Sequence, residues 1–401
     1  MRHAEAVYDD GTLYTISIRL APQIDQYTPA QDGVFEYEPT FTYHGFRYAE
    51  VSGVEEAPTV DDIVGKVFHS SSDFTGTFSC SNDSLNQLMS NILWTQRSNL
   101  MSTPNDCPQR DERMGWMGDI QAFGQTAVFN MDMAAFISKF AQDIRDGQAD
   151  DGRFPDYAPH PGAVNDPRKG APAWGDAGVF VPWTAYVNYA DKRLIEEQFS
   201  AAKAWVEYIR RNNPDLIWRS GRNNDYSDWM NGDEIKTPGW PTTGATVPKE
   251  IFATAFFARS TQILAKMAEV IGYPVDADRY RQLAEDIKAA FIREFVDADG
   301  KITGDTQAGY AIALHFNLLP EELREKAAAL MVDNILTKYQ GRLSTGIQTS
   351  HRMMMELVRE GYEDVAWQLM TSRSFPSWLY MVDNGATTIW ERWDGYVKGR
   401  G

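Results

Sequence analysis

The first part of the chain alternates between apolar and polar positions with the period of two that is typical of β-strands. Residues 12–20 show this alternation, and residues 41–51 repeat it with aromatic and β-branched side chains. Prolines and Gly/Asp clusters interrupt the runs. The pattern predicts that residues 1–72 form part of an antiparallel β-sandwich, in a segment too short to be a complete one.

Beyond this segment the apolar positions recur every three or four residues, the period of an amphipathic helix. Residues 81–83 (Ser-Asn-Asp) have the chemistry of a helix N-cap and precede the first apolar stripe. Further stripes cover residues 119–146, 177–190, 192–212, 248–271, 277–296, 305–316, 320–338, 346–359 and 362–371. About ten helices in succession, with no short repeat in the residues themselves, predict a helical barrel or toroid.

The loops between these helices are long and rich in Trp, Asp, Gly and Pro. They cover residues 101–118, 148–176, 219–247 and 372–396. Loops held by a rigid scaffold commonly carry the binding and catalytic residues of an enzyme. These four loops are therefore where we expect the functional site.

Composition and charge exclude several classes of partner. The 401 residues include 56 Asp and Glu against 38 Lys and Arg, which gives a formal net charge of −18. A negative field repels phosphate backbones and anionic lipids, so we expect neither a nucleic acid nor a membrane partner. The sequence has no apolar run that would indicate a transmembrane helix or a signal peptide. Its two cysteines favour a reducing, cytoplasmic compartment. The oligomeric state has no signal in the sequence.

Metal and cofactor chemistry also lack a sequence signal. The chain has no glycine-rich nucleotide-binding motif and no Gly-x-Ser-x-Gly motif. Its 6 histidines include no pair four residues apart and no His-Glu-x-x-His motif. We therefore expect no metal site and no cofactor.

Two carboxylate-rich segments lie far apart in the sequence. Residues 105–119 combine acidic residues with two arginines and a tryptophan, and residues 383–394 place Glu391 between Trp390 and Trp393. Ion pairs at helix starts would also explain both segments. Two carboxylates from distant loops suit glycoside hydrolysis, in which one protonates the leaving oxygen and the other activates water or attacks the sugar.

Two more loops join a tryptophan to a carboxylate. Trp174 precedes Asp176, and Trp229 follows Asp228. An indole stacks on the C–H face of a sugar, and a carboxylate accepts hydrogen bonds from sugar hydroxyls. Each tryptophan alone is also explained by a large core, but four such loops together favour a carbohydrate site.

The carboxylate segments resemble the signatures of a known family. Residues 106–119 resemble the signature loop of the bacterial α-L-rhamnosidases, glycoside hydrolase family 78, and residues 385–393 resemble that family's second signature. Residues 41–48, 174–177 and 343–346 are similar to further parts of the family. The resemblance covers essentially the whole chain.

The resemblance implies a mainly α fold, with a partial antiparallel β-sandwich over residues 1–72 and an (α/α)6 barrel over residues 73–401. It implies hydrolysis of terminal α-L-rhamnose from a rhamnose-containing glycoside or oligosaccharide, with inversion at the anomeric carbon. Glu112 would be the general acid and Glu391 the general base. Rhamnose would be held by Asp106, Arg110, Trp116 and Asp119, with Trp174 and Trp229 closing the pocket.

Members of the family are usually much longer than this chain. Their leading β modules have no counterpart here, and neither do the barrel helix, the β domain and the site histidine that follow the second signature. We therefore expect a fragment whose barrel is incomplete at its C-terminus. Three interpretations stay open: an inverting α-L-rhamnosidase, a truncated chain that binds rhamnosides with weak or no turnover, and a helical-barrel glycosidase acting on another sugar.

Overall fold

The computed structural model divides into two compact units. It describes residues 1–70, 72–161, 169–231 and 247–395, so parts of the loops expected at 148–176 and 219–247 lie outside the described residues. Unit 1 comprises residues 1–71 and 95–115, and unit 2 comprises residues 72–94 and 116–401. The segment that carries Glu112 therefore packs with the N-terminal residues.

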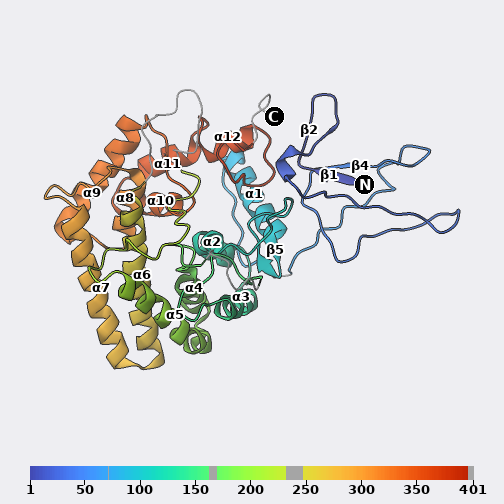
Figure 1. The fold of residues 1–401 in the computed structure, drawn as a ribbon. Helices are drawn as coiled ribbons and strands as arrows, with labels where there is room; N and C mark the ends of the chain where they lie inside the picture. Colours follow the sequence, from blue (N-terminus) through green and yellow to red (C-terminus); the bar gives the residue numbers. More distant parts are fainter. Residues whose placement is uncertain (71, 162–168, 232–246, 396–401) are drawn as a thin grey trace. The chain divides into compact units, whose positions relative to one another are not determined.

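Unit 1 contains short antiparallel strand pairs joined by long loops (Figure 1). The pairs are β1 (Arg2–Ala4) with β4 (Tyr48–Glu50), β2 (Ala6–Val7) with β3 (Leu13–Tyr14), and β5 (Leu100–Met101) with β6 (Thr103–Pro104). The strand predicted over residues 12–20 ends at Tyr14, and the chain turns through a 3-10 helix, η1 (Ile16–Ile18). In a strand Ile16, Ile18 and Leu20 would share one face, but only Ile18 is buried, so no common layer covers that face.

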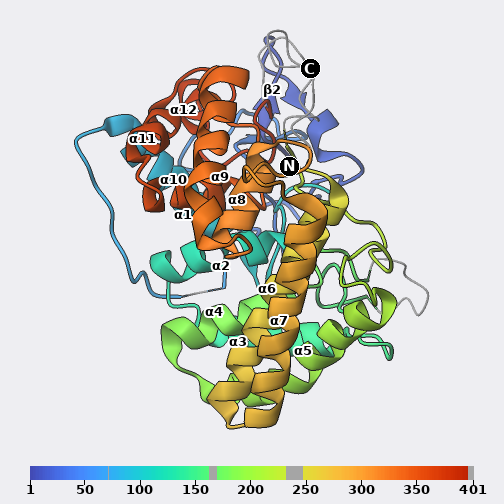
Figure 2. The same cartoon turned by 90° about the vertical axis from the view of Figure 1, so that its left-hand side faces the viewer.

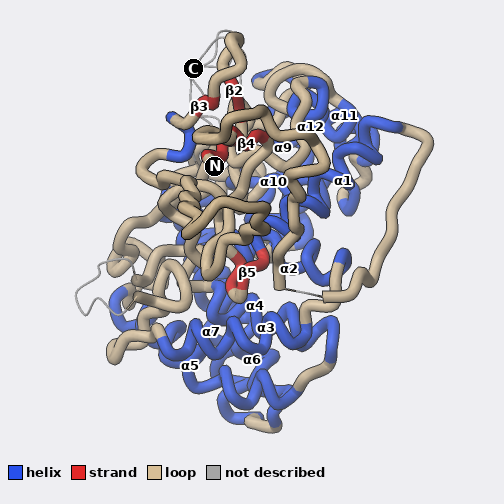
Figure 3. Tube along the Cα trace, turned by 90° about the vertical axis from the view of Figure 1, so that its right-hand side faces the viewer, coloured by secondary structure: helices blue, strands red, loops and turns tan. Residues whose placement is uncertain are grey.

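Helices make up most of unit 2, as Figure 3 shows in blue. In chain order they are α1 (Asp83–Asn99), whose last residues belong to unit 1, α2 (Met117–Asn130), α3 (Ala134–Asp146), α4 (Ala177–Tyr189), α5 (Lys192–Asn212), α6 (Lys249–Ile271), α7 (Pro274–Phe295), α8 (Gln307–His315), α9 (Glu321–Asp333), α10 (Ser350–Arg359), α11 (Glu363–Thr371) and α12 (Trp378–Asp383). Within the described ranges no helix is both long enough and apolar enough to cross a membrane.

The helical stripes predicted from the sequence correspond to these helices, with two differences. The stripe at residues 119–146 is two helices, because Asp132 accepts a hydrogen bond from the backbone of Ala134 and the backbone N–H of Met133 donates to the Tyr189 hydroxyl. These bonds replace the hydrogen bonds of a continuous helix and begin α3. The second difference is α12, which lies within the segment predicted as a loop. The predicted N-cap is confirmed, since the Asn82 side chain accepts from the backbone of Ser84 at 3.0 Å.

Inner and outer helices alternate along unit 2. The even-numbered helices contact one another in series from α2 to α10, while the odd-numbered helices pack beside them. Of the 9 residues of α8, 8 are buried, whereas α7 buries only 7 of 22. A helix buried all round lies inside a domain, and a helix with one apolar stripe lies at its surface. Figure 2 shows α6 and α7 side by side as one such hairpin, the arrangement expected of an (α/α)6 barrel.

Candidate active site

Three of the predicted site residues form one charged cluster in unit 1. The Nη2 atom of Arg110 lies 3.7 Å from Oδ2 of Asp106 and 2.9 Å from Oε2 of Glu112. A fourth member, Arg19, was not predicted from the sequence; its Nη1 donates to the same Oε2 at 2.9 Å. Two guanidinium groups therefore share one oxygen of Glu112. Arg19 lies in the N-terminal β segment, so no local motif signals its role.

A tight loop brings Asp106, Arg110 and Glu112 together. The Asp106 backbone N–H donates to the Met114 carbonyl at 3.0 Å, and the Asp106 side chain accepts from the Met114 N–H at 2.8 Å. These two bonds close the loop around the residues between them. Burial raises the pKa of Asp106, because desolvation outweighs its hydrogen bonds from Cys107 and Met114. Asp106 thus closes the loop through its hydrogen bonds to Met114 and also pairs with Arg110 in the charged cluster.

The backbone also positions Arg19. This residue has a φ of 53° at the end of η1, in a region that non-glycine residues seldom occupy. The preceding residue, Ile18, is buried at 2% exposure, so the turn is anchored by its apolar side chain. The anchored turn carries the Arg19 side chain to Glu112.

An aromatic cluster in unit 2 brings three predicted tryptophans together around Tyr226. The Tyr226 ring centroid lies 4.6 Å from that of Trp174, 5.8 Å from that of Trp116 and 6.1 Å from that of Trp229. The Tyr226 hydroxyl donates to Asp156 at 3.1 Å, which fixes the ring. Tyr226 was not among the predicted site residues, although its position three residues before Trp229 in the same loop was a usable signal.

Helix α2 supports this cluster from one side. Trp116 is its N-cap, and Asp119 stands in its first turn. A Cβ atom on Gly118 would lie 2.3 Å from the Trp174 indole, so the indole packs directly on the backbone of α2. Trp174 is only 3% exposed, which makes it part of the core behind the aromatic surface. The Nε1 atom of Trp116 is buried and has no partner among the described residues.

The carboxylates of the two Trp/Asp loops are structural, which differs from the interpretation made from the sequence. Asp176 is fully buried and accepts from Trp205 Nε1 at 3.0 Å and from the backbone of Ala173 at 2.8 Å. Desolvation by burial raises its pKa to about 6. Neither of its oxygens is accessible to a sugar hydroxyl.

Asp228 has the same character and joins two distant loops. It is fully buried, and its two oxygens accept from the backbone of Gly346 at 2.7 Å, of Gln348 at 3.0 Å and of Thr349 at 3.1 Å. The Thr349 hydroxyl donates to it as well. Burial raises the pKa of Asp228 despite these bonds. The residue therefore fixes the loop of Trp229 to the segment before α10.

Glu391 lies in unit 2, after α12, and is exposed. Its neighbour Trp393 is buried and packs edge-on against Trp378 of α12, with ring centroids 5.3 Å apart. Upstream, the Ala386 carbonyl accepts from the buried Asn91 side chain of α1 at 2.9 Å. These contacts fix the segment on both sides of Glu391 and leave its side chain at the surface.

Two family models together match nearly the whole chain. The bacterial alpha-L-rhamnosidase 6 hairpin glycosidase domain matches residues 73–401, and the bacterial alpha-L-rhamnosidase concanavalin-like domain matches residues 1–69. The first match contains both Glu112 and Glu391. The resemblance stated from the sequence and the predicted fold class are thereby confirmed.

Relatives of known name agree with this match. The chain is 42% identical over 395 residues to an alpha-L-rhamnosidase of Streptomyces avermitilis, which covers 98% of this chain and 36% of the relative. It is 36% identical over 411 residues to an alpha-L-rhamnosidase of Formosa agariphila, covering 100% of this chain and 42% of that relative. This chain thus spans about two fifths of the length of these relatives.

A solved structure gives the same result. The crystal structure of the Streptomyces avermitilis alpha-L-rhamnosidase complexed with L-rhamnose superimposes with a TM-score of 0.91 at 41% identity, covering 99% of this chain and 37% of that one. The structure of the alpha-L-rhamnosidase from Dictyoglomus thermophilum gives 0.89 at 37% identity, covering 98% of this chain and 43% of the other.

Proposed function

This chain belongs to the bacterial α-L-rhamnosidase family, and on that premise we propose that it hydrolyses terminal α-L-rhamnose from rhamnosides with inversion of configuration. Glu112 is the general acid of this proposal, and Glu391 is the general base. The reaction requires an acid that protonates the leaving oxygen and a base that activates water on the opposite face of the sugar, roughly 6.5–9.5 Å away. The exposed position of Glu391 is compatible with access of that water.

The arrangement of Glu112 is the observation that carries the proposal. Both arginines contact Oε2, and Oε1 has no partner among the described residues. Guanidinium groups only donate hydrogen bonds, so the carboxyl proton belongs on Oε1. Oε1 is then the atom that protonates the glycosidic oxygen, while Arg19 and Arg110 fix the orientation of the carboxyl group.

Recognition of the sugar follows from the remaining residues. Rhamnose is a 6-deoxy sugar, so its methyl group suits the aromatic surface formed by Trp116, Tyr226 and Trp229. Asp106 and Arg110 offer acceptors and donors to further hydroxyls, and Asp119 offers an acceptor from α2.

Proton NMR of the purified chain with an aryl α-L-rhamnoside tests the reaction. We expect β-rhamnose to appear before the α anomer, as inversion requires. Appearance of α-rhamnose first would contradict inversion and with it the role of Glu391 as a base toward water. Glu112→Gln and Glu391→Gln should each lower turnover by orders of magnitude. Asp111→Asn, an exposed neighbour in the same loop, is the matched control and should leave turnover nearly unchanged.

A second candidate function is binding of rhamnosides without turnover. It is the interpretation of a rhamnoside-binding chain that the sequence left open. Titration calorimetry with L-rhamnose, together with the NMR assay on the same folded sample, separates the two candidates. Binding without product supports this second function, and product formation eliminates it.

A further inference from the structure

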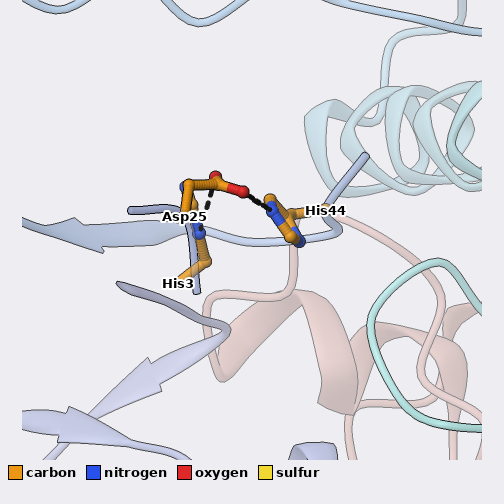
Figure 4. A group of neighbouring side chains, drawn as sticks. All are labelled: His3, Asp25 and His44. Carbon is orange, nitrogen blue, oxygen red and sulfur yellow. Dashed lines mark hydrogen bonds and ion pairs between the residues drawn. The ribbon is translucent and has the colours of Figure 1, made fainter. Parts of the chain in front are cut away.

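A group of metal-ligating side chains lies in the β segment of unit 1, apart from the charged cluster around Glu112. His3 belongs to β1, Asp25 follows the bridge between Arg2 and Ile24, and His44 precedes β4. Figure 4 shows that the carboxylate of Asp25 contacts both imidazole side chains. No sequence motif signals this group, because its three residues come from separate segments that only the fold brings together.

The ligand atoms of the three side chains lie near enough to one another to face a common ion. The His44 Nε2 atom lies 3.1 Å and 3.0 Å from the two oxygens of Asp25, and His3 Nδ1 lies 4.0 Å from the nearer one. One ligand atom from each residue lies within 4.8 Å of the others. Ligands at about 2.0–2.2 Å from a tetrahedral zinc ion are about 3.4 Å apart, so the His3 side chain must move closer to Asp25 when the ion binds.

The group is buried and carries a carboxylate without a permanently charged partner. The side chains of His3, Asp25 and His44 are 4%, 7% and 11% exposed. Among the described residues no lysine or arginine pairs with Asp25; its only ion-pair partners are the two histidines. A buried carboxylate is costly without a compensating positive charge, which a bound cation would supply.

We propose that His3, Asp25 and His44 bind a divalent transition-metal ion of the zinc class. Two imidazole nitrogens with one carboxylate oxygen favour zinc and its neighbours over calcium or magnesium, which prefer oxygen ligands throughout. The site lies in the β segment and holds three of its chain segments together. Its expected role is therefore structural rather than catalytic, and the inference does not rest on the proposed reaction.

The surroundings of the group accommodate this role. His3 Nδ1 lies 3.1 Å from the Gln23 carbonyl and would give up that contact to bind the ion. The carbonyl keeps a partner, since the backbone N–H of His3 also donates to it at 3.1 Å. The Gln23 amide oxygen is buried without a partner in the described part of the chain, while its Nε2 donates to Gly45, the residue after His44. This oxygen is the candidate for the fourth ligand.

Titration calorimetry of the full, metal-free chain with zinc chloride tests the site. We expect one ion per chain and a dissociation constant that rises at least tenfold in Asp25→Asn and in His44→Gln. His69→Gln is the matched control, because His69 lies in the same unit and its Nδ1 contacts the carbonyl of Ser70 at 2.9 Å. Absence of zinc binding by the folded chain, or equal affinity in the Asp25 and His44 variants, would overturn the proposal.

A second measurement on the unsubstituted chain covers the case in which the variants fail to fold. Crystals soaked in zinc chloride and measured on both sides of the zinc absorption edge should give an anomalous peak between His3, Asp25 and His44. A peak only elsewhere, or none at this position, would overturn the proposal. Neither measurement uses enzymatic activity, so a failure here is distinct from a failure of the proposed reaction.

Discussion

Replacing Arg19 with glutamine removes one of the two guanidinium groups that fix Glu112. If Arg19 orients the general acid, the change slows only those reactions in which the leaving oxygen needs a proton. An alkyl rhamnoside needs this proton, whereas a 2,4-dinitrophenyl rhamnoside releases a stable anion without it. The two substrates therefore separate an effect on the acid from an effect on sugar binding or on folding.

The structure sets the magnitude of this effect. The Arg19 side chain is 53% exposed and that of Glu112 25%, so solvent screens the pair. Exposed pairs of this kind contribute about 0.5–1 kcal/mol. If that energy is lost in the transition state, kcat falls about two- to fivefold. We expect this decrease with the alkyl rhamnoside, no decrease with the dinitrophenyl rhamnoside, and an unchanged KM for both.

Two further variants complete the experiment. Arg19→Lys keeps a charge but loses the planar fork of donors, so it should recover part of the lost rate. Arg2→Gln is the matched control, because Arg2 is 46% exposed and pairs with Glu50 at 3.3 Å in the same unit. An equal decrease with both substrates, or no decrease with the alkyl rhamnoside, would refute the orienting role of Arg19.

Three further predictions concern the framework of unit 2. Asp228→Asn leaves at least one buried backbone N–H without an acceptor and should lower the free energy of unfolding by about 1–3 kcal/mol. Urea titrations measure this loss, and an unchanged urea midpoint would contradict it. Gly118→Ala places a Cβ 2.3 Å from the Trp174 indole, so tryptophan fluorescence should change and binding of L-rhamnose should weaken; unaltered fluorescence and affinity would refute the close packing. Burial raises the pKa of Asp176 from 3.8 to about 6. Between these two pH values the unfolded chain has lost the Asp176 proton, whereas the folded chain still holds it. Relative to Asp176→Asn, the parent should lose about 3 kcal/mol of stability as pH rises through that interval, and a constant difference would contradict the raised pKa.

The helices of unit 2 could be predicted from the sequence because a buried stripe repeats within a few residues. The same local argument found the Asn82 cap, whose partners are its immediate neighbours. The strands of unit 1 are shorter than the sequence pattern predicts. A strand requires a partner segment and a covering layer, and the local pattern reveals neither. Leu20 is 88% exposed and Phe41 fully exposed, so their alternating pattern has no such layer in the described chain.

Residue type alone does not separate catalytic carboxylates from structural ones, but their hydrogen-bond partners do. Asp176 and Asp228 stand beside tryptophans, as a sugar-binding acid would, yet protein donors occupy both oxygens of each. Glu112 differs, because its two partners occupy one oxygen and leave the other for a substrate. A proton donor needs such a vacant atom, and only long-range contacts reveal it. Glu112→Gln should therefore affect turnover with little change in stability, whereas Asp228→Asn should lower stability first.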